Sequence, residues 1–249
     1  MPAVPLVAVA HGSRDPRSAA CVGDLLAVAR TRRPDLDVRG AFLDLSAPRL
    51  ADVLAALHGE GHRTVVVAPL LLGRAFHARV DLPALIDEAL GRLPRLSVTV
   101  ADVLGPDAAL ERAALRRLAE IDARPGDRGL GVVLAATGSS HPPANARVHE
   151  IADRWARTQG WSGVRAAFAS AADPGVPAAV AALRARGAER IAVAGYFLAP
   201  GLLPDRVAAE AAAADPGARV AAPLGPAVEV ADLLLSRYDE VGTARARTA

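Results

Sequence analysis

Two histidines and one carboxylate follow three successive apolar runs of this 249-residue chain. His11 comes directly after the first run, Asp44 closes the second, and His77 lies nine residues past the third. Imidazoles exchange protons near neutral pH and bind metal ions, and a carboxylate can take a proton onward or orient an imidazole. The three side chains are candidates for one site if the fold brings the ends of the three runs together.

The segments that carry these residues alternate between strand-like apolar runs and amphipathic, helix-like stretches. The expected strands are residues 4–10, 38–43, 64–68 and 96–100, then 130–136, 163–168, 190–194 and 219–222. In the first half the helices begin near Pro16, Pro48, Arg79 and Asp107. Such alternation predicts an α/β fold in which a parallel sheet has helices on both faces. Ligands of open parallel sheets gather at the carboxyl ends of the strands, where this trio falls.

A tandem duplication relates the two halves of the chain. His11-Gly12-Ser13 aligns with Thr137-Gly138-Ser139 at an offset of 126 residues, and the same offset pairs Pro48 with Pro174. The polar, turn-rich segment 124–129 separates the copies. We therefore expect an N-terminal domain of residues 1–124 that carries the active site and a C-terminal domain of residues 125–249 that lacks the histidines. Residues 241–249 show no apolar period, so we expect a loose tail.

The duplication serves as an internal comparison for the trio. At the offset of 126 residues, His11 is replaced by Thr137, Asp44 by Ser170 and His77 by Leu203. The surrounding scaffold persists while all three polar groups are absent together. This joint loss favours one functional unit in the first copy over three independent structural residues.

Composition excludes several classes of protein. The formal net charge is only +2 and the arginines are scattered, so we expect no nucleic-acid partner. The single cysteine, Cys21, cannot form an intramolecular disulfide, and we expect it to be packed in the first helix. No window resembles a signal peptide or a membrane span. We expect a cytoplasmic protein without a membrane partner.

Three motifs resemble those of the sirohydrochlorin chelatases, the cobalt and iron chelatases with two flavodoxin-like halves. They are AHGSRDP at residues 10–16, FLDLSAP at 42–48 and APLLLGRAFHARVDLP at 68–83. The resemblance covers nearly the whole chain. It implies two tandem flavodoxin-like domains and insertion of a divalent metal, Co²⁺ or Fe²⁺, into sirohydrochlorin for sirohaem or corrinoid synthesis. In the family the residue that ends the second strand is usually Glu, whereas here it is Asp44.

The resemblance also implies roles for individual residues. His11 and His77 would bind the incoming metal, and Asp44 would assist them as a third catalytic residue. Imidazoles are borderline ligands that suit cobalt, iron or nickel, and two of them release a metal that a closed four-ligand cage would retain. The metal is then a substrate, and no cofactor is bound permanently. Residues expected to hold the substrate carboxylates are Ser13, Arg14, Arg17, Arg74 and Arg79.

Alternatives stay open at this stage. The same histidines, in a cleft between the expected strand ends, could serve a non-catalytic tetrapyrrole or metal carrier. A phosphate-handling enzyme such as a histidine phosphatase is more distant, because Ala10 stands where that group has Arg before His-Gly. We expect the remaining histidines to be surface or capping residues and the two tryptophans to lie in the core or at its rim. The internal duplication predicts a monomer.

Overall fold

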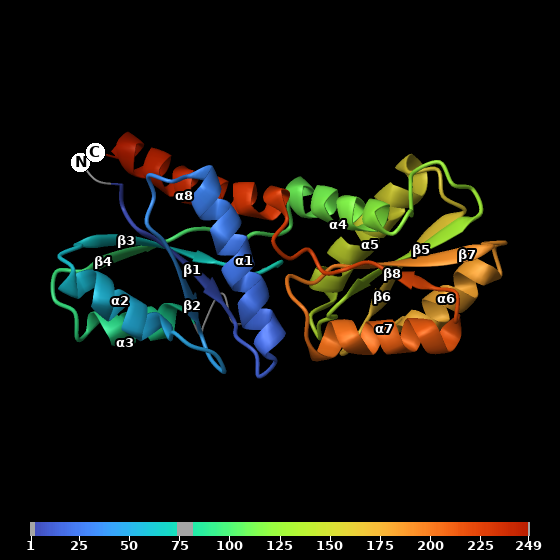
Figure 1. Ribbon diagram of the computed structural model, residues 1–249, viewed down its shortest axis with the longest axis horizontal. Helices are drawn as coiled ribbons and strands as arrows, with labels where there is room; N and C mark the ends of the chain where they lie inside the picture. The colour runs from blue at the N-terminus through green and yellow to red at the C-terminus, as the bar shows by residue number, and fades with distance from the viewer. Residues whose placement is uncertain (1–2, 74–81, 249) are drawn as a thin grey trace. The chain divides into compact units, whose positions relative to one another are not determined.

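Strands and helices alternate along the whole chain, as the hydrophobic pattern predicts (Figure 1). The structure is a computed structural model that describes residues 3–73 and 82–248. The first eight elements are β1 (Leu6–Ala10), α1 (Pro16–Arg32), β2 (Val38–Phe42), α2 (Leu50–Gly59), β3 (Thr64–Pro69), α3 (Leu82–Leu90), β4 (Ser97–Val100) and α4 (Ala108–Glu120). The next eight are β5 (Leu130–Ala136), α5 (Pro142–Thr158), β6 (Gly163–Phe168), α6 (Val176–Arg184), β7 (Arg190–Gly195), α7 (Leu202–Ala214), β8 (Arg219–Val220) and α8 (Val228–Thr248).

The strands form two parallel four-stranded sheets of identical topology. Their orders are β2-β1-β3-β4 and β6-β5-β7-β8. In the first sheet Leu6 of β1 is level with Val38 of β2 and with Val66 of β3. The carboxyl ends of β1, β2 and β3 therefore lie side by side, and the strand order reverses at β1. The predicted α/β fold is confirmed. The three strands that precede His11, Asp44 and His77 in the sequence are neighbours in the sheet.

Buried apolar residues explain why β1 and β5 lie inside their sheets rather than at an edge. Every residue of both strands is buried, as expected for strands covered on both faces. On one face of the first sheet, Val7 and Val9 belong to the same core as Leu54 of α2 and Ile86 of α3. On the other face, α1 and α8 pack against each other and α8 packs on β3. Within the described residues, no helix is long and apolar enough to cross a membrane.

The last helix of each sequence repeat packs in the unit formed by the other repeat. The chain divides into two compact units, one of residues 1–109 and 225–249 and the other of residues 110–224. Helix α8, from the second repeat, lies in the first unit, and α4 lies in the second from Leu110 onward. The compact units divide at residues 109 and 224, whereas the boundary expected from the sequence repeat lies between residues 124 and 125.

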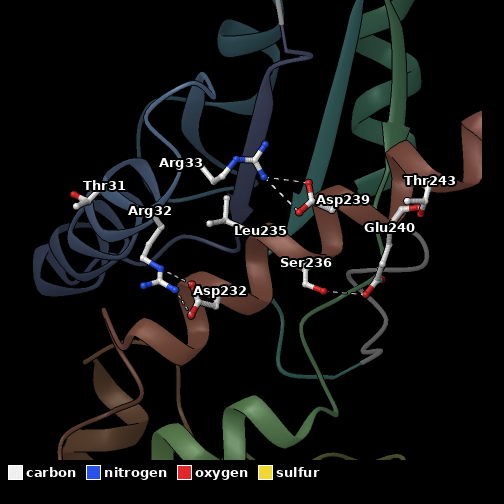
Figure 2. Close-up of a pocket in the computed structure, with 9 residues that line it drawn as sticks. All are labelled: Thr31, Arg32, Arg33, Asp232, Leu235, Ser236, Asp239, Glu240 and Thr243. Carbon is white, nitrogen blue, oxygen red and sulfur yellow. Dashed lines mark hydrogen bonds and ion pairs between the residues drawn. The ribbon is translucent and has the colours of Figure 1, made fainter.

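Ion pairs attach α8 to the rest of the first unit. Arg32 and Arg33, at the end of α1, bind Asp232 and Asp239 of α8 with N–O distances of 2.7 and 3.2 Å (Figure 2). Arg237 of α8 also binds Asp107 at 2.9 Å. The expectation of a loose tail over residues 241–249 is wrong up to residue 248, because α8 continues to Thr248. Alanine and arginine, which dominate that segment, are among the best helix formers and need no apolar period to extend a docked helix.

Candidate metal-handling site

The loop that carries His11 is bonded to the loop that carries Asp44. The Asp44 backbone N–H donates to the His11 carbonyl at 2.9 Å. Between them Gly12 has φ +96°, and a Cβ added there would lie 1.7 Å from the Asp44 carbonyl oxygen. Only glycine allows this approach, because it has no side chain and adopts positive φ at little cost. The His11 side chain is exposed at the carboxyl end of β1, beside the end of β2.

A serine on each loop ties the two loops together a second time. The Ser13 backbone N–H donates to Ser46 Oγ at 3.1 Å, and that hydroxyl donates to the Ser13 carbonyl at 2.9 Å. The Ser13 hydroxyl in turn accepts from the Asp15 backbone N–H at 3.0 Å. These bonds hold the backbone around His11 in place. They make Ser13 a brace of the loop, alongside its expected role as a substrate contact.

The carboxylate of Asp44 is held by two donors on the same oxygen. The Leu45 backbone N–H donates to Oδ1 at 2.8 Å, and Arg49 Nη1 donates to Oδ1 at 2.7 Å. These bonds, first the one from Leu45 and then the one from Arg49, lower the pKa of Asp44, with a smaller contribution from the nearby His11. The ionised form of Asp44, beside a histidine, is thus stabilised further.

The arginines that are expected to bind the substrate carboxylates differ in the contacts that they make in the structure. Arg14 is exposed on the loop after His11. Arg17 donates from Nε to both carboxylate oxygens of Asp15 at 3.1 Å, and its Nη2 lies 2.5 Å from Oδ2. Asp15 also caps α1 by accepting from the Arg17 backbone N–H. Arg17 would therefore have to leave this carboxylate to bind one on a substrate, which makes Arg14 the better candidate. His77, Arg74 and Arg79 lie outside the described residues.

The second half repeats the loop geometry without the chemistry. The Ser170 backbone N–H donates to the Thr137 carbonyl at 3.0 Å, and a Cβ on Gly138, with φ +85°, would lie 1.9 Å from the Ser170 carbonyl oxygen. Gly12 and Gly138 thus make the same contact at positions 126 residues apart. The backbone of the site is duplicated while His11 and Asp44 are replaced by hydroxyl-bearing residues.

His58, His141 and both tryptophans lie where the sequence predicts. His58 contacts the Pro94 carbonyl at 2.9 Å at the surface, and His141 occupies the position before α5. Trp155 and Trp161 are buried and stack edge to face with centroids 6.1 Å apart. Cys21 is partly buried in α1.

Two other polar features lie away from the strand ends that carry His11 and Asp44. Asp37, Glu60 and His62 gather near the amino ends of β2 and β3, where Arg39 binds both carboxylates and so competes with any cation. A pocket of about 730 Å³ lies between the end of α1 and α8 (Figure 2). His11 precedes the start of α1, a helix of 17 residues or roughly 25 Å, so this pocket is remote from it.

Arg49 is the residue that sequence reasoning missed. It was not distinguished from the other arginines of an arginine-rich chain. The signal was present in the duplication, because the position 126 residues later is Gly175, so Arg49 is absent from the second half together with Asp44.

The two duplicated parallel sheets, with a histidine and a carboxylate at adjacent strand ends of the first, define a tandem α/β protein with a candidate site in its first half. The family model described as CbiX matches residues 5–121 and 131–241, one match in each half. The chain belongs to the CbiX family.

Individual relatives agree with this assignment. Sirohydrochlorin cobaltochelatase of Priestia megaterium is 28% identical over 207 residues, which are 80% of this chain and 65% of that protein. Sirohydrochlorin ferrochelatase of the same organism is 25% identical over 205 residues, covering 81% of this chain and 76% of the relative. The first match thus spans just under two thirds of the relative's length. The structure of SirB from Bacillus subtilis with Fe³⁺ is similar with a TM-score of 0.81 and 24% identity, covering 95% of this chain and 94% of that one.

Proposed function

We propose that this protein inserts a divalent metal ion, Co²⁺ or Fe²⁺, into sirohydrochlorin. The observation that carries the proposal is the pairing of the His11 and Asp44 loops at 2.9 Å in the first half, with the same backbone but neither side chain in the second. The relatives named as sirohydrochlorin chelatases supply the substrate and the reaction.

Insertion requires removal of water from the ion, distortion of the ring and loss of two pyrrole protons. His11 and His77 take the metal as neutral imidazoles, which bind transition ions reversibly and accept protons near neutral pH. Asp44, whose ionised form the bonds from Leu45 and Arg49 stabilise, adds negative charge beside His11 and favours the arrival of a cation. The metal is a substrate in this scheme, and the protein needs no permanent cofactor.

Arginines near the site recognise the carboxylates of sirohydrochlorin. A planar guanidinium binds a carboxylate through two parallel hydrogen bonds. Arg14 serves first, because it is exposed on the His11 loop. Arg74 and Arg79, which flank His77 in the sequence, bind further carboxylates. Arg17 binds a substrate carboxylate once its ion pair with Asp15 is broken. The protein works in the cytoplasm. It works as a monomer, since the duplication supplies two α/β units in one chain.

The decisive experiment measures the absorbance change of sirohydrochlorin with Co²⁺ or Fe²⁺ over many turnovers. His11→Ala and His77→Ala should each abolish insertion, while far-ultraviolet circular dichroism stays unchanged. Thr137→Ala, at the position equivalent to His11, is the matched control and should keep full activity. Full activity of either histidine variant refutes this mechanism. A wild-type reaction that stops after one equivalent identifies a carrier instead of an enzyme.

A further inference from the structure

Arg49 joins two parts of the Asp44 loop from the position just before α2. Its Nη1 lies 2.7 Å from Asp44 Oδ1 and 3.1 Å from the Leu43 carbonyl oxygen. The Leu45 backbone N–H donates to the same Oδ1 at 2.8 Å. In the part of the chain that the structure describes, both bonds fall on Oδ1 and Oδ2 accepts no hydrogen bond. One oxygen of the carboxylate is fixed and the other is left available.

Comparison with the second half shows that the two contacts of Arg49, with a carbonyl and with a carboxylate, are independent of each other. There the carbonyl of Ala169, equivalent to that of Leu43, accepts a hydrogen bond from Arg206 Nη1 at 3.0 Å. Arg206 comes from α7, whereas the residue equivalent to Arg49 is Gly175. The bond to the carbonyl is therefore kept in both halves by different arginines. Among the described residues, the contact with a carboxylate is found in the half that carries His11 and not at the equivalent place in the other.

The solvent exposure of Arg49 and Asp44 indicates that their ion pair contributes little to the stability of the fold. The side chains of Arg49 and Asp44 are 50% and 59% exposed, and ion pairs so exposed add little to stability. Two donors on one oxygen nevertheless restrict the orientation of a short carboxylate. That restriction matters only if the carboxylate must meet something at a defined place.

We propose that Arg49 is a positioning residue for metal insertion, which holds Oδ1 of Asp44 so that Oδ2 stays available to the incoming ion on the loop bonded to His11. This inference rests on the proposed function. It makes Arg49 act through Asp44, without touching the substrate itself.

The test is a set of variants in the multiple-turnover insertion assay with Co²⁺ and sirohydrochlorin. Arg49→Gln should lower kcat about tenfold, the lower end of the effect of a residue that orients a metal-site group, with little change in KM for sirohydrochlorin. Arg49→Lys should recover most of the rate, because an ammonium can still donate to Oδ1. In an Asp44→Asn background, Arg49→Gln should have no further effect. Arg206→Gln, which removes the equivalent carbonyl bond in the second half, should leave the rate unchanged.

Three results overturn the inference: an Arg49→Gln rate within about twofold of wild type, an equal loss in the Asp44→Asn background, or an equal loss in Arg206→Gln. Thermal unfolding checks that the variants fold, since removing an exposed ion pair should shift Tm by no more than about 4 °C. His11→Ala distinguishes the two levels of failure. If wild type turns over and His11→Ala does not, an active Arg49→Gln refutes only the role of Arg49. If wild type does not turn over, the proposed function fails and the inference with it.

Discussion

A methyl group added at Gly12 should damage both stability and activity. In Gly12→Ala the new Cβ would lie 1.7 Å from the Asp44 carbonyl oxygen, far inside van der Waals contact, so the two loops must separate. The left-handed φ of +96° costs an alanine about 1–2 kcal/mol. Separation also weakens the backbone bond at 2.9 Å and the two bonds between Ser13 and Ser46, each contributing about 1 kcal/mol. Together these losses amount to about 4 kcal/mol, or a decrease in Tm on the order of 10 °C.

The duplication supplies a matched control for this prediction. Gly138→Ala makes the same contact in the second half, with its Cβ 1.9 Å from the Ser170 carbonyl oxygen. Both variants should lose stability in thermal unfolding, Gly138→Ala less, because Ala172 stands where Ser46 holds Ser13 in the first half. Only Gly12→Ala should lose metal insertion when assayed well below its Tm. An unchanged Tm for Gly12→Ala would refute the close approach of the loops. Equal loss of activity in both variants would refute the assignment of the site to the first half alone.

Two further predictions concern pH and the division of the chain. Arg17 lowers the pKa of Asp15, so the stability from this ionised carboxylate is fully present above its usual value of 3.8 and is lost as pH falls through the lowered folded-state value. Asp15→Asn, which keeps a good N-cap, should thus lower Tm at pH 7, and its difference from wild type should shrink as pH falls below 3.8; a difference that stays constant in acid contradicts this. A fragment of residues 1–124 lacks α8 and should bind a hydrophobic dye such as ANS, whereas residues 110–224 form a complete unit and should unfold cooperatively. Cooperative unfolding of 1–124 without dye binding would show that α8 is dispensable.

The hydrophobic pattern predicts the strands well because the inner ones are buried on both faces. Residues 6–10 and 130–136 are continuous apolar runs, and each is the second strand of its sheet. The same pattern does not predict where α4 and α8 pack. An amphipathic helix such as α4 shows which face is apolar, through Leu110 and Leu118, but not which of two similar sheets that face will cover.

The candidate site follows from sequence only in part. Strand neighbourhood explains why His11 and Asp44 meet, because β1 pairs with β2 in register. The ion pair between Arg17 and Asp15 depends on the side-chain conformations at the start of α1, and the residue types alone do not determine it. Arg49 was detectable only by comparison with Gly175, because its identity is common in this chain and its position is what distinguishes it.

The exchange of α4 and α8 sets the order in which the protein can be completed during synthesis. The unit of residues 110–224 is continuous in sequence and can fold once those residues have left the ribosome. The unit that carries His11 and Asp44 begins earlier in the sequence but is completed by α8, which follows the whole of the other unit. The face of α1 that packs against α8 must therefore stay uncovered until α8 has been synthesised. A nascent or prematurely terminated chain would contain the residues of the site without the finished unit that supports them.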